Sequence, residues 1–228
     1  TNFDLVASLS NRRADVSGRV WSDAFNLTPG GVVDLSDNTF DGVTLNFELL
    51  KPSALAENLS GAGLNAALKL DGAFATPKVD YKITANRIVM NDMGLLGFVA
   101  NGAATVNSDR IMIPVTARVA RITGLDLAAG GKLENVALDG DLAIDGPRIL
   151  SDNMRIKSDR IDAKLILLAD MSTGLYTGAV DGRLDDYRLE SVGIFNVDTD
   201  MNLKAKADGY ALEGMVRARS TRLLNDSV

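Results

Sequence analysis

The chain of 228 residues contains no cysteine and no histidine. Without them it cannot form a disulfide framework, a Ser-His-Asp triad, a cysteine nucleophile or a metal site of the His/Cys type. Aromatic residues are also scarce, at 5%, whereas 46% of the residues are hydrophobic and 21 are glycine. The chain is therefore aliphatic and glycine-rich, and it holds few of the side chains that catalysis uses. Its stability must come from backbone pairing and packing.

Long hydrophobic runs and an excess of positive charge are missing as well. The longest apolar runs, such as residues 165–169 and 94–100, are far shorter than the roughly 20 residues of a transmembrane helix. Lys and Arg total 24 against 30 Asp and Glu, so a nucleic-acid partner is not expected. A mean hydropathy of +0.06 with 24% charged residues is not the composition of a disordered chain.

The dominant pattern is a strict alternation of apolar and polar residues. It recurs in one stretch after another and is typical of strands with one dry and one wet side. The apolar residues that we expect to share the dry side are Leu45, Phe47, Leu68, Leu70, Val79, Tyr81, Ile83, Ile111, Ile113, Val115, Leu138, Leu142, Ile144, Leu165, Leu167, Phe195, Val197, Met201 and Leu203.

Helix signals are confined to residues 51–59, where Ser53 could cap one short helix that ends before Gly61. Glycine-rich breaks such as residues 30–31, 61–63 and 130–131 indicate turns or bulges between strands. The sequence therefore predicts an all-β protein, an elongated and repetitive antiparallel sheet with at most one or two short helices.

The chain also repeats itself. The sequence SDRI at residues 108–111 recurs at 158–161, and TGL at 123–125 then recurs at 173–175 without a gap. Similarity at a fixed offset predicts an internal repeat of residues 108–127 in 158–177, a unit that stacks on its neighbours. We expect residues 1–228 to be a single segment of a longer repetitive protein.

One stretch has the spacing of a calcium-binding loop. Asp37, Thr39, Asp41, Gly42 and Glu48 stand at the ligand and turn positions of an EF-hand. That geometry needs a helix on each side, but the flanking residues are turn-like upstream and alternating downstream. The sequence favours an Asp/Asn-rich turn between strands, and no metal or cofactor is expected.

The paired carboxylates also have an ordinary explanation. The pairs at residues 185/186, 198/200 and 139/141 fall on wet strand sides or in turns, beside lysine or arginine, whereas acid–base catalysis places two carboxylates in a cleft. A small basic cluster of Arg217, Arg219 and Arg222 is either a charged strand face or a contact for an acidic partner or a lipid headgroup. The protein is not expected to be an enzyme.

The apolar side itself has two interpretations. One-sided strands can pack two sheets into a closed core, or the face can stay open as a groove for hydrocarbon, since aliphatic side chains contact acyl chains without directional polar demands. The pattern alone leaves both open.

The stretches that carry a family resemblance lie between residues 108 and 228. They read LENVALDGDLAIDGP at 133–147, SDRIDAKL at 158–165, TGLY at 173–176, VDGRL at 180–184 and YRLESVGIFNVDTD at 187–200. These stretches resemble the AsmA-like proteins of Gram-negative envelopes, especially the TamB/YdbH branch.

The resemblance implies a periplasmic sheet folded into a U-shaped, taco-like groove. Its host protein would be anchored in the inner membrane by a helix outside this chain and would reach toward the outer membrane. It implies a non-enzymatic bridge that carries phospholipid, or another acyl lipid, between the two membranes in outer-membrane biogenesis. The apolar residues above would line the groove, and an envelope protein is a candidate partner.

Two alternatives stay open. One is a β-solenoid with a closed core that serves as a binding, adhesin or scaffold module. The other, an enzyme such as a β-helical polysaccharide lyase or hydrolase, needs clustered polar groups in a cleft, which the even spread of charge disfavours.

Overall fold

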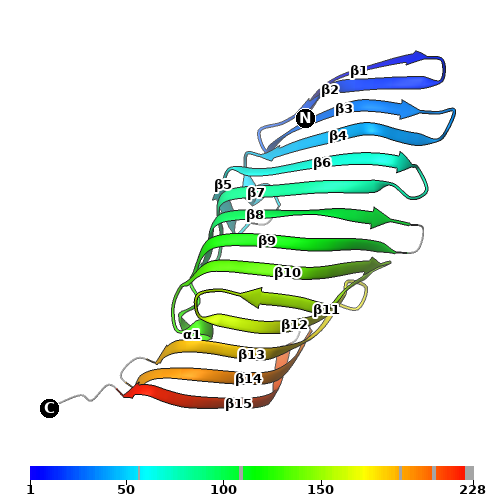
Figure 1. The fold of residues 1–228 in the computed structure, drawn as a ribbon. Coiled ribbons are helices and arrows are strands. Elements are labelled where there is room, and N and C mark those ends of the chain that lie inside the picture. The colour runs from blue at the N-terminus through cyan, green and yellow to red at the C-terminus, as the bar shows by residue number, and fades with distance from the viewer. Residues whose placement is uncertain (56, 108–109, 190–191, 207–208, 224–228) are drawn as a thin grey trace. The chain divides into compact units, whose positions relative to one another are not determined.

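The protein consists almost entirely of antiparallel strands (Figure 1). This computed structural model describes residues 1–55, 57–107, 110–189, 192–206 and 209–223. Its helices are a 3-10 turn, η1 (Pro52–Ala54), and one turn of α-helix, α1 (Asp126–Ala129). The predicted all-β class with at most two short helices is therefore confirmed for the described residues.

The strands follow one another across an open sheet in the order of the chain, with β5 paired to β7 off this path. Their bounds are β1 Asn2–Ser10, β2 Arg13–Trp21, β3 Phe25–Asp34, β4 Thr39–Leu49, β5 Leu59–Ala62, β6 Leu64–Ala73, β7 Lys78–Met90, β8 Met93–Val106, β9 Ile111–Thr123, β10 Leu133–Asp145, β11 Arg148–Lys157, β12 Ile161–Asp170, β13 Leu175–Leu189, β14 Gly193–Lys206 and β15 Gly209–Leu223.

The chain divides into two compact units. Unit 1 comprises residues 1–91 and 96–114, and unit 2 comprises residues 92–95 and 115–228. In unit 1 the strands β1–β4, β6 and β7 pair with their neighbours, and in unit 2 the strands β10–β15 do the same.

Residues 51–59 form much less helix than expected. Among the described residues of this stretch only η1 is helical; Lys51 occupies its N-cap position and makes no side-chain capping bond. The chain then enters β5 at Leu59, opposite Met90 of β7. Pairing with β7 thus replaces the local helical preference.

Strands β5 and β6 act as one bent strand against β7. Leu59 lies opposite Met90 and Asn65 lies opposite Thr84, so the two segments keep the same register on either side of Gly63. Gly63 has a φ of 65°, which other residues adopt with strain. The break between β5 and β6 is therefore a bend rather than a change of partner.

In unit 2 a half-buried arginine, Arg160, acts as a clamp that holds α1 to the sheet. The Arg160 guanidinium donates hydrogen bonds to the backbone carbonyl oxygens of Ala129 (2.8 Å), Lys132 (2.9 Å) and Asp186 (2.9 Å). These carbonyls belong to the end of α1, the loop after it and an irregularity in β13, where the register shifts after Leu184. Arg160, in the repeated SDRI segment at residues 158–161, thus ties helix and strand together.

The two predicted repeats begin alike and then differ. Strands β9 and β12 start at Ile111 and Ile161, fifty positions apart. Thr123 then ends β9 ahead of α1, whereas Thr173 lies in the turn between β12 and β13. Ser108 and Asp109 lie outside the described residues. The repeat stays a prediction.

The described residues have almost no closed core. The chain exposes 14296 Å² of surface, whereas a compact domain of 24.2 kDa is expected to expose about 10,000 Å². No large side chain among the described residues is completely buried, and most of the buried hydrophobic residues are alanines. Within each unit the strands contact their sheet neighbours, and no second sheet formed by described residues packs on either face.

Glycines within strands allow close approaches between backbones. A Cβ on Gly102 in β8 would lie 2.2 Å from the Pro114 carbonyl oxygen and 2.8 Å from the Tyr81 hydroxyl. That hydroxyl donates a hydrogen bond to the same carbonyl at 2.6 Å. Only glycine fits here, because a side chain would have to displace backbone as well as Tyr81.

We predict that Gly102→Ala lowers the free energy of unfolding by about 2 kcal/mol. Gly30→Ala is the control, because a Cβ there meets its nearest atom, the Thr44 hydroxyl, at 3.4 Å. Urea unfolding of both variants measures the difference. Equal stability of the two would contradict the close approach at Gly102.

Candidate functional site

The candidate site is the apolar side of the sheet, considered in each unit separately. In unit 1 the cross-strand register aligns apolar residues from β3 to β7. One row runs from Pro29 through Leu45 and Leu68 to Tyr81. The next rows align Leu27, Phe47, Ala66 and Ile83, and Val43, Leu70 and Val79. These residues are the unit 1 apolar face.

Members of the unit 1 apolar face are half-buried rather than buried. Ile83 is 41% exposed, and Leu45, Phe47, Leu68 and Tyr81 are intermediate. Cross-strand neighbours shield each other's flanks, but the ends of the side chains lack a covering layer within the described residues. The seven predicted residues of this unit in β4, β6 and β7 all lie on this face.

Unit 2 repeats the arrangement on β10–β15. The rows are Met154, Leu165, Val180 and Met201; Leu138, Ile156, Ala163, Gly182 and Thr199; Ile161, Leu184 and Val197; and Ile144, Ile149, Ala169 and Tyr176. Leu167 lies opposite Gly178, and Phe195 lies opposite Tyr187. These residues are the unit 2 apolar face, and Leu167 is 41% exposed.

The remaining predicted residues belong to none of the cross-strand rows that define the two apolar faces. Ile111, Ile113 and Val115 alternate along β9 as half-buried residues between exposed neighbours. Leu142 falls within the irregular stretch of β10, where the register shifts between Asp139 and Ala143. The backbone of Leu203 lies opposite Gly178, but its side chain lies outside the described residues.

Several members of the apolar faces are not predicted by the sequence pattern. Val180 and Leu184 lie on β13, where Gly178 and Gly182 interrupt the alternation. Met154 follows a register shift in β11, which moves the apolar positions out of phase. Across these glycines and bulges, alternation no longer shows which side of the sheet a residue faces. The pairing with the neighbouring strand is needed to assign the side.

The opposite side of unit 2 carries a row of alternating charges. Lys157, Asp162, Arg183, Asp198 and Arg217 lie opposite one another in sequence across β11–β15. Opposite charges at directly facing positions stabilise an antiparallel pair and disfavour slipped registers. We call this set the charge row.

Asp198 and Asp200, one of the predicted pairs of solvated carboxylates, lie on this polar side. A hollow of about 640 Å³ is bordered by Asp162, Asp181, Asp198 and Asp200 together with Arg183 and Arg217. Arg155 binds Asp162 through two hydrogen bonds of 2.9 and 2.7 Å. This pairing, led by the hydrogen bond, lowers the pKa of Asp162 and raises that of Arg155. Asp162 is thus paired with an arginine rather than with a second carboxylate.

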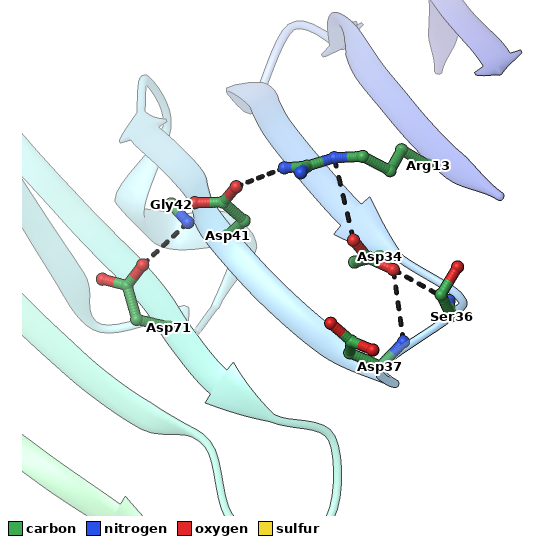
Figure 2. Close-up of polar contacts among 7 residues, drawn as sticks. All are labelled: Arg13, Asp34, Ser36, Asp37, Asp41, Gly42 and Asp71. Atoms are coloured by element: carbon green, nitrogen blue, oxygen red, sulfur yellow. Dashed lines mark hydrogen bonds and ion pairs between the residues drawn. The ribbon is translucent and has the colours of Figure 1, made fainter. Parts of the chain in front are cut away.

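The calcium-like spacing forms a hairpin turn, as the sequence favoured. Asp34 Oδ1 accepts hydrogen bonds from the backbone amides of Ser36 (2.8 Å) and Asp37 (3.2 Å), and Arg13 pairs with Asp34 and Asp41 (Figure 2). No group of three or more acidic side chains in the described residues is arranged to hold a metal ion. The carboxylates instead support the turn and its neighbouring strands.

Asp71 joins this polar network from β6. Its Oδ1 accepts a hydrogen bond of 2.7 Å from the Gly42 amide, shown in Figure 2, and its Oδ2 lies 2.7 Å from Lys69 Nζ. The Lys69 hydrogen bond and then the Gly42 amide hold the pKa of Asp71 below its usual 3.8. Folding therefore favours the ionised carboxylate.

We predict that acid destabilises the protein through such groups. A lowered pKa adds stability that is fully present above the usual value of 3.8 and is lost as the pH falls through the lower folded value. Asp71→Asn should show a smaller drop in thermal midpoint than the parent chain when the pH is lowered from about 5 to about 2. An identical drop in both proteins would contradict the role of Asp71.

Ser151 is a buried polar residue on the unit 2 apolar face. It lies opposite Leu167, is only 5% exposed, and its hydroxyl has no hydrogen-bond partner. An unpaired buried hydroxyl destabilises the folded state. Ser158, in contrast, accepts hydrogen bonds from the Arg160 and Ile161 amides, both at 3.1 Å.

We predict opposite effects for the two serine-to-alanine changes. Ser151→Ala should raise the free energy of unfolding by about 1 kcal/mol, and Ser158→Ala should lower it by about 1 kcal/mol. Chemical denaturation of the pair provides the measurement. Destabilisation by Ser151→Ala would show that its hydroxyl contributes to the fold.

Comparisons with known proteins add no family. No protein-family model, curated protein or solved structure matches the chain. Among the described residues, no helix combines the length and apolar character needed to cross a membrane. The arguments for function therefore rest on the geometry of the two faces.

Proposed function

We propose that the protein is a non-enzymatic carrier segment that holds the acyl chains of phospholipid, or of another acyl lipid, against its apolar faces. The observation that carries the proposal is that each unit presents rows of aligned aliphatic side chains, over which the part of the chain that the structure describes places no second layer. In water such a surface is unfavourable, and contiguous exposed apolar patches mark binding surfaces.

The chemistry of the faces fits hydrocarbon better than a polar ligand. Charged groups of unit 2 gather on the opposite side of the strands, in the charge row, whereas the apolar rows contain aliphatic residues, alanine, glycine and few polar groups. The side chains of Leu, Ile, Val and Met bind an acyl chain through contact area alone, so they do not fix its position along the sheet. An acyl chain could therefore slide along such a surface while its headgroup stays in water.

The proposal extends to location. The resemblance to AsmA-like sequences favours a bridge across the periplasm between inner and outer membranes, with contacts to both membranes made by regions outside residues 1–228. It stays a prediction. A protein with this role needs no cofactor and no catalytic group.

A binding, adhesin or scaffold role is the second candidate. The described sheet is open and its pairings are antiparallel, whereas a closed-core solenoid encloses its apolar residues. A scaffold would need its apolar faces to be covered by protein, and this difference can be measured.

The test compares two neighbouring residues on opposite faces. Leu167, 41% exposed, lies on the unit 2 apolar face, and Ile166, 45% exposed, lies on the other side of β12. A photo-reactive amino acid at Val180, on the apolar face, is crosslinked to labelled phospholipid in vesicles of phosphatidylethanolamine and phosphatidylglycerol. Leu167→Glu should lower the crosslinking yield about tenfold, because a carboxylate in contact with hydrocarbon loses its hydration. Ile166→Glu should leave the yield unchanged.

Circular dichroism of both variants checks that they fold, and mass spectrometry of the purified parent chain checks for bound lipid. Equal yields from two folded variants, or no crosslink to lipid in the parent chain, would overturn the proposal. Crosslinks to protein instead of lipid would favour the scaffold.

A further inference from the structure

The polar side of unit 1 carries a hollow whose border is mostly uncharged. The hollow has a volume of about 450 Å³ and crosses β3, β4, β6 and β7, each of which is paired on both sides. Only two of the residues that border it are charged, Glu48 and Lys82. The hydrogen-bonding side chains around them are amides and hydroxyls, those of Asn26, Asn46, Asn65, Thr28 and Thr84.

The cross-strand register arranges the border of the hollow in two rows. Asn26, Glu48, Asn65 and Thr84 form one row, and Thr28, Asn46, Ala67 and Lys82 form the other. We call them the amide rows. Neighbouring strands are about 4.8 Å apart, so each row presents one side chain at that interval across four strands. Ala67 has no polar group, and its short side chain leaves room between longer neighbours.

Much of the hydrogen-bonding capacity of the amide rows is not used within the chain. Asn26 donates a hydrogen bond of 2.9 Å to Glu48, and Asn65 donates one of 3.0 Å to the Gly63 carbonyl oxygen. The side chain of Asn46 makes no hydrogen bond with any other described residue and is exposed. An asparagine amide offers two N–H donors and a carbonyl acceptor. The hollow therefore presents donors and acceptors together.

The single tryptophan of the chain stands at the end of one amide row. Trp21 lies opposite Asn26, so it is on the polar side of the sheet, where it is half-buried. The Arg19 guanidinium lies 5.5 Å from the centre of the Trp21 ring and donates a hydrogen bond of 2.8 Å to Asn26 Oδ1. Tryptophan combines a large apolar surface with one N–H donor, which suits ligands that are partly apolar and partly polar.

We propose that this hollow binds an extended neutral glycan, a chain of uncharged sugars that lies across the strands along the amide rows. Sugar hydroxyls donate and accept hydrogen bonds, as asparagine amides do, and the C–H groups of sugar rings pack on apolar surfaces such as Ala67 and Trp21. The advance per sugar of an extended glycan is close to the spacing of strands, so successive sugars meet successive strands.

The charge of the hollow favours a neutral ligand over an ionic one. Glu48 and Lys82 have opposite signs, so the residues that border the hollow have no net charge. The hollow on the polar side of unit 2, in contrast, is bordered by four aspartates and two arginines. A phosphate or a basic peptide would meet one charge of its own sign in the unit 1 hollow, and the amides give it little compensation.

The inference goes beyond the proposed function and does not depend on it. Asn26 and Asn65 lie on one side of the sheet, whereas Leu27 and Ala66, their neighbours in sequence, belong to the unit 1 apolar face. Lipid and glycan would therefore contact opposite sides of the same strands.

Glycan titration tests the proposal, and Trp21 is its reporter. Cellohexaose and chitohexaose are added to the chain of residues 1–228, and tryptophan fluorescence and calorimetry are recorded. We expect a saturable change in fluorescence. Asn46→Ala should weaken binding about fivefold, because the ligand loses its hydrogen bonds to the amide. The control, Asn101→Ala, removes an exposed asparagine of β8 outside the hollow and should bind as the parent chain does.

Salt and glycan length provide two further measurements. Raising sodium chloride from about 50 to about 500 mM should leave the affinity unchanged, because salt does not screen the contacts of an uncharged ligand. Cellohexaose should bind more tightly than cellobiose, since the amide rows cross four strands.

Three results would overturn the proposal. The first is the absence of both a fluorescence change and heat with either hexasaccharide. The second is equal affinity of the parent chain and an Asn46→Ala variant that circular dichroism shows to be folded. The third is binding that salt abolishes, which would indicate an ionic ligand. Loss of lipid crosslinking with glycan binding intact would affect only the proposed function.

Discussion

The register of antiparallel pairing is the constraint on which the rest of the structure depends. Partner residues in such a pair point to the same side, so one aligned position propagates across every strand of a unit. Leu45, Leu68 and Tyr81 share a face because their backbones are paired, and Lys69 and Asp80 share the other face for the same reason. Separate apolar and polar sides follow directly.

A single layer changes how the fold is stabilised. In a sandwich the apolar sides of two sheets bury each other, but here the buried residues are mostly small, and the larger aliphatic side chains shield one another only along the rows. Backbone hydrogen bonds and cross-strand contacts must therefore supply most of the stability. Two local interactions add to the stability. The Arg160 clamp holds α1 to the sheet, and the absence of a side chain at Gly102 allows the Tyr81 hydroxyl to reach the Pro114 carbonyl.

The same architecture explains why apolar surface stays exposed. A closed barrel would enclose one face of the sheet, whereas the open sheet retains an apolar side without a covering layer among the described residues. On the other side of unit 2 the charge row favours one register of strand pairing, because residues of opposite sign face one another across β11–β15.

The sequence alone predicts the strands and their apolar sides, because the period of two in the apolar pattern is specific to strands. Strict alternation in residues 43–49 and 195–201 is incompatible with a helix, so the strands and their dry sides were predictable, as was the turn at Asp37. Pairing partners were not. Val180 and Met154 lie on the apolar face because of pairing registers that the glycines and bulges of β13 and β11 obscure in the sequence. Residues 51–59 form little helix because β5 pairs with β7.

The local pattern also cannot predict whether the apolar side is enclosed, because a buried face and an open face have the same alternation. Only the tertiary structure shows that no second layer lies over the described faces, since covering a face depends on contacts between distant segments rather than on the order of neighbouring residues.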